Sequence, residues 1–228
     1  MSLILAISTS SQSASISLIK SGSVLAEPLV MHNNLSHTKT LMPMIDELFS
    51  SFAISCNDID CFAVDTGPGS FTGVRIGVAT ANGLAMGSGK PIIGISSLLA
   101  LRYYQLEISP VASIIDAHND NVYAAIYFNK SATLAPCATT IHDLIEKIPA
   151  NTLCLGDGAN AHHALISELQ PTAKFSSEES GIIKASCVGL AAWDRIEDCG
   201  SVEAASSGIV LPTYLKLSQA ERNAKKEE

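Results

Sequence analysis

A glycine-rich run is the part of this 228-residue chain with the clearest potential for chemistry: Gly67-Pro68-Gly69-Ser70-Phe71-Thr72-Gly73. It follows an apolar run that ends at Asp65 and opens a segment with helical spacing, so the free N–H groups of that helix could bind an anion. The spacing is GxGxxxG, one residue longer than the dinucleotide fingerprint GxGxxG, and no GxxxxGK[ST] phosphate loop occurs. The glycines therefore fit either an anion site or a tight turn with close helix packing.

Few other catalytic or metal-binding motifs occur in the sequence. A phosphotransferase of the actin or sugar-kinase type needs an acidic residue at the end of its first strand to organise Mg²⁺ and phosphates, and Ser8 stands there. The 6 histidines form no HxxxH or HExxH pair, and no GxSxG nucleophile elbow is present. In the second half of the chain, only Gly156-Asp157-Gly158 resembles a phosphate-binding loop. The sequence predicts a protein without a catalytic centre or metal site of its own.

Composition favours a folded cytoplasmic protein with a partner. Apolar residues make up 47% of the chain and charged residues only 16%, against roughly 25% charged in an average soluble protein. A surface so poor in charge favours a dimer or an obligate partner, and a net charge of −8 argues against binding nucleic acid alone. The 6 cysteines form no CxxC pair and are expected to be reduced. Neither a signal peptide nor a membrane span is predicted.

Hydrophobic patterns predict two successive units, each an antiparallel meander followed by helix, strand and helix. The pattern restarts near Leu106–Pro110, so we place an N-terminal lobe at 1–107 and a C-terminal lobe at 108–228, with a C-terminal tail free to return to the first lobe. The expected strands lie at 3–7, 13–18, 24–31, 59–65, 91–95, 111–116, 122–128, 132–139 and 152–155, and the expected helices at 36–52, 71–88, 96–106, 141–147, 160–170 and 185–197.

Two helices of the first unit carry unusual faces. The helix over 36–52 has an apolar stripe wider than one sheet needs, and in the helix over 71–88 small residues recur every four positions. Such a face lets another helix approach closely. We therefore predict that both helices form the main partner surface and that Gly77 and Ala81 face outward. The residues assigned to this surface are Leu41, Met42, Ile45, Leu48, Phe49, Gly73, Val74, Gly77, Val78, Ala81 and Ala85.

Several segments resemble the TsaB (YeaZ) family, in the family's order and over nearly the whole chain. The most specific is Asp65-Thr66-Gly67-Pro68-Gly69-Ser70-Phe71-Thr72-Gly73-Val74-Arg75-Ile76-Gly77. The chain departs from the family at Ser8, where the first strand usually ends in Asp, and at His118 and Asn119, where basic residues are usual. The other matching segments are Leu5–Ser10, Ser36-His37-Thr38 with Leu41-Met42-Pro43, Pro91–Leu98, Asp116-Ala117 with Val122-Tyr123, and Pro212–Leu215.

The resemblance implies an α/β, two-lobed actin/Hsp70/sugar-kinase-like (ASKHA) fold with duplicated lobes of mixed sheet and helices. It also implies a non-catalytic scaffold subunit of the bacterial complex that places threonylcarbamoyl on the adenosine beside the tRNA anticodon. An older glycoprotease label for such chains is not supported. The alternative from the residues alone is an independent ATP-dependent phosphotransferase or hydrolase on the same fold.

Partners follow from the resemblance as expectations. They are a TsaD-like catalytic subunit, a TsaE-like ATPase, a second copy of the chain in isolation, and tRNA only through the complex. No cofactor is expected to bind tightly, and weak binding of ATP or ADP at the cleft or the complex interface stays open. Arg75 lies one turn into the second helix, where a cation opposes the helix dipole. We expect a carboxylate or a backbone carbonyl to hold it, either within the chain or across an interface.

Overall fold

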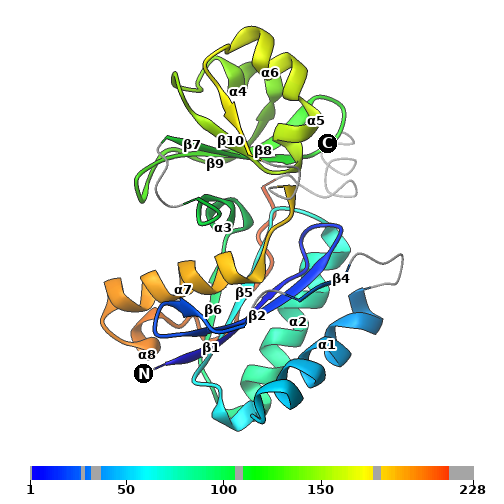
Figure 1. The fold of residues 1–228 in the computed structure, drawn as a ribbon, viewed down its shortest axis with the longest axis vertical. Coiled ribbons are helices and arrows are strands. Elements are labelled where there is room, and N and C mark those ends of the chain that lie inside the picture. Colours follow the sequence, from blue (N-terminus) through cyan, green and yellow to red (C-terminus); the bar gives the residue numbers. More distant parts are fainter. Residues whose placement is uncertain (1, 27–28, 32–36, 106–109, 177–180, 216–228) are drawn as a thin grey trace, which may run out of the picture.

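Two mixed β-sheets divide the described part of the molecule into two lobes (Figure 1). This computed structural model describes residues 2–26, 29–31, 37–105, 110–176 and 181–215. The first sheet has the order β3 (Ser23–Val24), β2 (Ala14–Lys20), β1 (Leu3–Ser8), β5 (Cys61–Asp65), β6 (Ile92–Ile95), and β4 (Leu29–Met31) pairs with β2. The second has the order β11 (Lys174–Phe175), β10 (Leu153–Leu155), β7 (Val111–Asp116), β8 (Asn121–Phe128), β9 (Ser131–Thr140). In both sheets an antiparallel meander continues into parallel strands, which confirms the predicted duplication.

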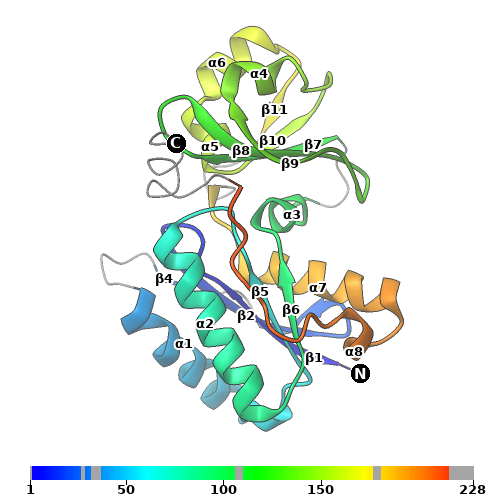
Figure 2. The same ribbon diagram turned by 180° about the vertical axis from the view of Figure 1, so that it is seen from behind.

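Helices cover both faces of the first sheet. One face carries α1 (His37–Phe52) and α2 (Phe71–Ser88), and the opposite face carries α7 (Ala185–Cys199) (Figures 1 and 2). A short 3₁₀ helix, η1 (Cys56–Asp58), precedes β5, and α8 (Val202–Ala205) follows α7. Among the described residues, no helix has both the length and the hydropathy needed to cross a membrane.

Strand β1 explains why both faces need helices. Its side chains alternate, so that Leu5 and Ile7 join the core under α1 and α2 while Ile4 and Ala6 join the core under α7. The continuous apolar run at 3–7 was predicted to be a strand buried on both faces, and the structure confirms this.

Helix α7 belongs to the first lobe, although the sequence-based division placed it in the range 108–228. It packs on β1, β2 and β5, and its Gly189 lies so close to Ala6 and Ile19 that an added Cβ would clash with Ile19. The Ala185 N–H at its first turn donates to the Ser15 hydroxyl over 2.9 Å. The return to the first lobe therefore starts at α7 and not only in the tail, because the second face of the first sheet needs a cover.

The second lobe is smaller. Its sheet is covered on one face by α4 (Ile141–Ile145), α5 (Asp157–Ala161) and α6 (His163–Leu169), and its other face meets α3 (Ser97–Arg102), which lies between the lobes (Figure 1). The single helix expected at 160–170 is broken at His162, whose backbone is not helical. The strand expected at 24–31 is divided between β3 and β4, and residues 27 and 28 lie outside the described residues.

Candidate functional site

The glycine turn, Gly67–Gly73, packs against the loop that joins β1 to β2. The Ser10 carbonyl accepts from the Ser70 N–H over 2.7 Å, and the Thr9 hydroxyl donates to the Gly73 carbonyl over 2.7 Å. A Cβ atom added at Gly69 would clash with the Ser10 carbonyl, and one added at Gly73 would clash with the Thr9 carbonyl. Thr9 and Ser10 are buried. The turn thus serves close packing of the loop on α2, which is the simpler of the two alternatives read from the sequence.

Asp65, at the end of β5, is completely buried below this loop. Its carboxylate accepts hydrogen bonds from the hydroxyls of Ser8, over 2.9 Å, and Ser10, and from the Thr9 N–H over 3.4 Å. The Ser97 hydroxyl, at the start of α3, lies 3.5 Å from the same carboxylate. Burial raises the pKa of Asp65, and the hydrogen bonds from Ser10 and Ser8 oppose that rise. Ser8, where the acidic residue of a phosphotransferase would stand, is therefore a buried donor to Asp65.

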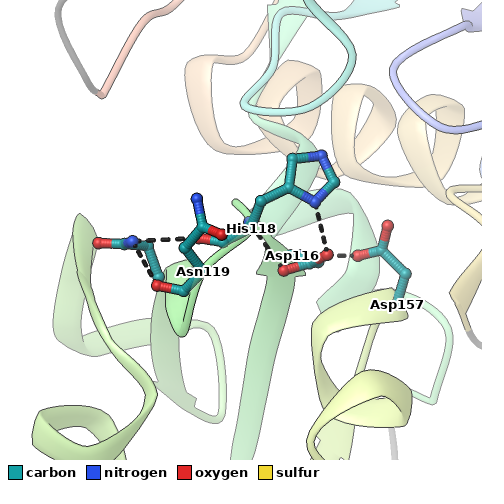
Figure 3. Close-up of polar contacts among 5 residues, drawn as sticks. Asp116, His118, Asn119 and Asp157 are labelled. Carbon is teal, nitrogen blue, oxygen red and sulfur yellow. Dashed lines mark hydrogen bonds and ion pairs between the residues drawn. The ribbon is translucent and has the colours of Figure 1, made fainter.

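The second lobe presents a polar cluster toward the first lobe, at the end of β7 (Figure 3). Asp157 accepts from the Asp116 N–H over 3.0 Å, and His118 Nδ1 lies 3.2 Å from Asp116 Oδ2. Asn121 donates to the backbone carbonyls of His118 and Asn119 over 3.0 and 2.8 Å. Burial raises the pKa of Asp157, and hydrogen bonds from the Asp116 and Gly158 N–H groups oppose this. Asp157, Asp116 and the His118–Asn119 backbone are thus held together by hydrogen bonds within the cluster.

No set of three or more His, Cys, Asp or Glu side chains in the described ranges is arranged to hold a metal ion. Asp65 and Asp157, the carboxylates singled out beside the two glycine-rich loops, lie in different lobes. Asp157 contacts the second-lobe hairpin, whereas Asp65 contacts the β1–β2 loop. Each of the two acidic candidates is therefore held by hydrogen bonds within its own lobe.

Most residues assigned to the partner surface are buried within the chain itself. On α1, Leu41, Ile45 and Leu48 are core residues, Phe49 is half-buried, and Met42 is exposed by 43%. The α2 residues Gly73, Val74, Gly77, Val78, Ala81 and Ala85 are all buried.

The expectation that Gly77 and Ala81 face outward is wrong. A Cβ at Gly77 would clash with the Thr9 hydroxyl, and Ala81 is wholly buried in the core of the first lobe. The physical reason is that this small-residue face accommodates the β1–β2 loop and the sheet. Whether α1 and α2 form the partner surface stays a prediction.

The outward face of α2 carries the other line of small residues. Ala79, Gly83 and Gly87 are exposed, and an added Cβ at either glycine would meet no atom within 4 Å. Met86, exposed by 73%, lies in the same stripe. We call Ala79, Gly83, Met86 and Gly87 the outward stripe. Its spacing was visible in the sequence, but nothing local distinguished it from the buried line.

An extended segment, Ser206–Leu215, runs beside α2 on the first lobe (Figure 2), and we call it the strap. The Asn82 side chain makes two hydrogen bonds to the backbone of Val210 in the strap. Its Nδ2 donates to the Val210 carbonyl over 2.8 Å, and its Oδ1 accepts from the Val210 N–H over 3.1 Å. The Thr213 N–H donates to the Thr66 carbonyl over 2.7 Å. The sequence analysis allowed a C-terminal tail to return to the first lobe, but it did not predict that the tail would lie along α2.

Within the described part of the chain, Arg75 is held by the strap rather than by a carboxylate or carbonyl, and a partner across an interface stays a prediction. Its Nε donates to the Tyr214 hydroxyl over 2.8 Å, and its guanidinium carbon lies 3.8 Å from the centroid of the Phe71 ring. The rings of Phe71 and Tyr214 are 5.2 Å apart. A cation near the start of a helix is thus offset by aromatic faces, which attract it.

Comparisons with known proteins agree with the resemblance read from the sequence. The family model described as "TsaD: tRNA N6-adenosine threonylcarbamoyltransferase" matches residues 32–223. The tRNA threonylcarbamoyladenosine biosynthesis protein TsaB of Bacillus subtilis is 30% identical over 235 residues, which cover 96% of each chain. The TsaB of Haemophilus influenzae is 37% identical over 123 residues, which cover 53% of this chain and 51% of that protein.

Solved structures support the same relationship. YeaZ from Pseudomonas aeruginosa is 27% identical, with a TM-score of 0.72, and the match covers 94% of this chain and 100% of that chain. The activator of the 2-hydroxyisocaproyl-CoA dehydratase from Clostridium difficile shares the fold at 10% identity, with a TM-score of 0.55 and coverage of 86% and 96%. The predicted two-lobed actin/Hsp70/sugar-kinase-like fold is confirmed.

Proposed function

Because the chain belongs to the TsaB (YeaZ) family, we propose that it takes part in the biosynthesis of threonylcarbamoyladenosine in tRNA as a non-catalytic scaffold subunit. The names of its relatives support the pathway. The burial of its β1–β2 loop supports the scaffold role.

The observation that carries the proposal is the closed β1–β2 loop. In a phosphotransferase of this fold, a loop at this place must remain accessible to phosphates. Here Thr9 and Ser10 are buried against Gly69, Gly73 and the Asp65 carboxylate. The loop and α2 leave no room between them even for an added Cβ at Gly69 or Gly73. This favours a scaffold over the alternative, an independent ATP-dependent phosphotransferase or hydrolase.

The proposed partners are a TsaD-like catalytic subunit and a TsaE-like ATPase. The match to a TsaD family model supports a role beside TsaD. In isolation we propose a homodimer, and we propose that tRNA is bound only through the complex, because the net charge of −8 disfavours direct binding to phosphates. No cofactor is proposed to bind tightly, and any ATP or ADP would bind weakly at the cleft or the complex interface.

Catalytic inertness can be tested directly. We expect the purified chain to hydrolyse no ATP above background and to contain no stoichiometric zinc or iron. The measurements are a coupled ATPase assay and elemental analysis, with Asp65→Asn and Asp157→Asn variants as controls for contaminating activity. Turnover that disappears in either variant would favour the phosphotransferase or hydrolase alternative.

The partner surface is proposed to be the outward stripe with the neighbouring exposed side chains of α1 and the strap. Met42 of α1 and Ile209 and Leu211 of the strap are exposed by 43%, 64% and 73%. They belong to the two segments that neighbour α2, whose outward glycines leave room for a partner helix. Large apolar interfaces of this kind are dominated by a few central contacts.

We expect Ala79→Glu to weaken binding to a TsaD-like partner while the chain remains folded. Ala79 is exposed, so the free energy of unfolding should change by no more than about 0.5 kcal/mol, whereas a charge at the centre of the interface should weaken binding at least about tenfold. Binding is measured by calorimetry and folding by thermal unfolding. Leu169→Glu, at an exposed position of α6 in the other lobe, is the matched control. Unchanged affinity of the folded Ala79→Glu protein would place the interface elsewhere.

A further inference from the structure

Beyond the proposed function, we infer that the turn between β8 and β9 is a clamp that sets the angle between the two lobes. The turn residues are Asn129 and Lys130, and both contact the first lobe or the helix between the lobes. Their contacts join three elements that are distant in the sequence: the turn, α3 and α7.

Helix α3 acts as the pivot between the lobes. It has only six residues, and its Leu98 and Leu101 share one continuous core with Ile115 and Tyr127 of the second sheet and with the helix α7 of the first lobe. Apolar packing of this kind holds two bodies together without a preferred direction. Because α3 is short and packs against both lobes, its apolar contacts oppose separation of the lobes. They oppose rotation of one lobe relative to the other about the axis of α3 less strongly. Contacts away from that axis must fix the angle.

The first such contact is made by Arg102, the last residue of α3. This side chain is only 4% exposed. Its Nε donates to the Asn129 carbonyl over 2.9 Å, and its Nη1 donates to the Gln105 carbonyl over 2.9 Å. The planar guanidinium thus binds the turn of the second lobe and the chain leaving α3 at fixed relative positions.

The second contact reaches the first lobe itself. Lys130 Nζ lies 2.7 Å from Asp194 Oδ2 on α7, and the Tyr103 hydroxyl donates to the same oxygen over 2.8 Å. The hydrogen bond to Asp194 raises the pKa of Lys130, and Asp198, one turn further along α7, attracts the same cation. Asp194 therefore ties the turn and the end of α3 to one point of α7.

This clamp should control geometry more than stability. The side chain of Lys130 is 68% exposed and that of Asp194 is 28% exposed, and ion pairs in such surroundings contribute little to folding. Reversing the charge at Lys130 would place a carboxylate beside Asp194 and Asp198, so that the turn is repelled from α7. Each lobe keeps its own core and should remain folded.

The test measures the angle between the lobes in solution. Residual dipolar couplings of backbone amides are fitted separately to the two lobes for the unaltered protein, Lys130→Glu, and the charge-swapped Lys130→Glu/Asp194→Lys variant. Lys147→Glu is the matched control, because it makes the same charge change at an exposed position of the second lobe. Thermal unfolding of each variant confirms that it is folded.

We expect one alignment tensor to fit both lobes of the unaltered protein and of the Lys147→Glu control. The charge-swapped variant should recover only part of the common fit, because it restores the ion pair but loses the acceptor of the Tyr103 hydroxyl. In Lys130→Glu the two lobes should need different tensors, with a loss of coupling amplitude in the second lobe. One common tensor in Lys130→Glu would overturn the inference, and so would a charge-swapped variant that is as loosened as Lys130→Glu. Tyr103→Phe provides a second variant that keeps all charges and should give a smaller loss of the same kind. Neither the dipolar couplings nor the thermal unfolding depends on tRNA modification. The inference about the clamp and the proposed function can therefore fail independently of each other.

Discussion

A single methyl group added at Gly73 is expected to lower the free energy of unfolding by about 3 kcal/mol, as overpacking of a buried site does. Inside a helix, alanine is normally better than glycine by about 1 kcal/mol. At Gly73 the new Cβ would clash with the Thr9 carbonyl, and a backbone atom cannot rotate away. The β1–β2 loop would have to leave α2, with loss of the hydrogen bond from the Thr9 hydroxyl to the Gly73 carbonyl. The effect of the methyl group should therefore have the opposite sign to the usual one.

The outward stripe provides the matched control for this prediction. Gly83 and Gly87 lie in the same helix, and an added Cβ meets nothing within 4 Å at either position. Gly83→Ala and Gly87→Ala should each raise the free energy of unfolding by about 0.5–1 kcal/mol. Urea unfolding followed by the fluorescence of Trp193, the 1 tryptophan of the chain, measures all three variants. Equal effects at Gly73 and Gly83 would contradict the packing described for the β1–β2 loop.

A substitution at Gly77 tests contact with the side chain of Thr9, whereas one at Gly73 tests contact with its backbone. Its added Cβ would clash with the Thr9 hydroxyl, while the next nearest atom, the Thr9 Cβ, is 3.5 Å away. Removing the hydroxyl with Thr9→Ala should relieve Gly77→Ala but not Gly73→Ala, which meets the carbonyl. A double-mutant cycle measures this coupling. Additive effects at Gly77 would mean that the loop moves as a whole.

Local signals in the sequence were sufficient to predict most of the elements. The strand at β1 was predicted because its apolar run is continuous, and the α2 helix was predicted from small residues that recur every four positions. The structure adds a cap that was not predicted, because the Gly73 N–H donates to the Ser70 hydroxyl over 3.2 Å. The position of α7 could not be predicted, because its amphipathic face is equally suited to either sheet. What places it on the first sheet is contact with Ala6 and Ile19, far away in the sequence.

The orientation of α2 was missed for a similar reason. Two lines of small residues run along the helix, and composition alone makes them equivalent. The residue that decides between them is Thr9, which contacts Gly73 and Gly77 but lies more than sixty positions earlier. The partner of Arg75 within the chain was likewise missed, because Tyr214 is 139 positions away. Helix periodicity is local information, whereas the choice of the buried face depends on the tertiary contact.

The candidate site shows the same limit. Ser8 was interpreted as a missing acidic residue, which is correct for its position, but its actual role depends on Asp65 in a neighbouring strand. Parallel pairing of β1 and β5 brings the two strand ends together. A buried carboxylate surrounded by serine hydroxyls has no local pattern in the sequence. Its presence has a measurable consequence for the pH dependence of folding.

Replacing Asp65 with asparagine is expected to remove a pH dependence of stability that opposes the usual one for carboxylates. Burial raises the pKa of Asp65 above its ordinary value of 3.8, so the folded state binds this proton more tightly than the unfolded state does. As the pH rises from 3.8 through the folded-state pKa, the unfolded chain releases the proton first. The contribution of Asp65 to stability is therefore largest at low pH and is lost across that window.

Asparagine keeps the shape of the side chain, and the hydroxyls of Ser8, Ser10 and Ser97 can rotate to accept from its amide. Above the window, Asp65→Asn should be at least as stable as the unaltered protein, whereas Asp65→Ala leaves those hydroxyls without their acceptor and should be less stable by about 1–3 kcal/mol. Urea unfolding of the unaltered protein and of Asp65→Asn is measured at several pH values between about 4 and 8. The difference in their free energies of unfolding gives the pH-dependent contribution of Asp65. A difference that stays constant with pH, or an unaltered protein that gains stability relative to Asp65→Asn as the pH rises, would mean that the carboxylate is ionised from the start and that its hydroxyl donors outweigh its burial.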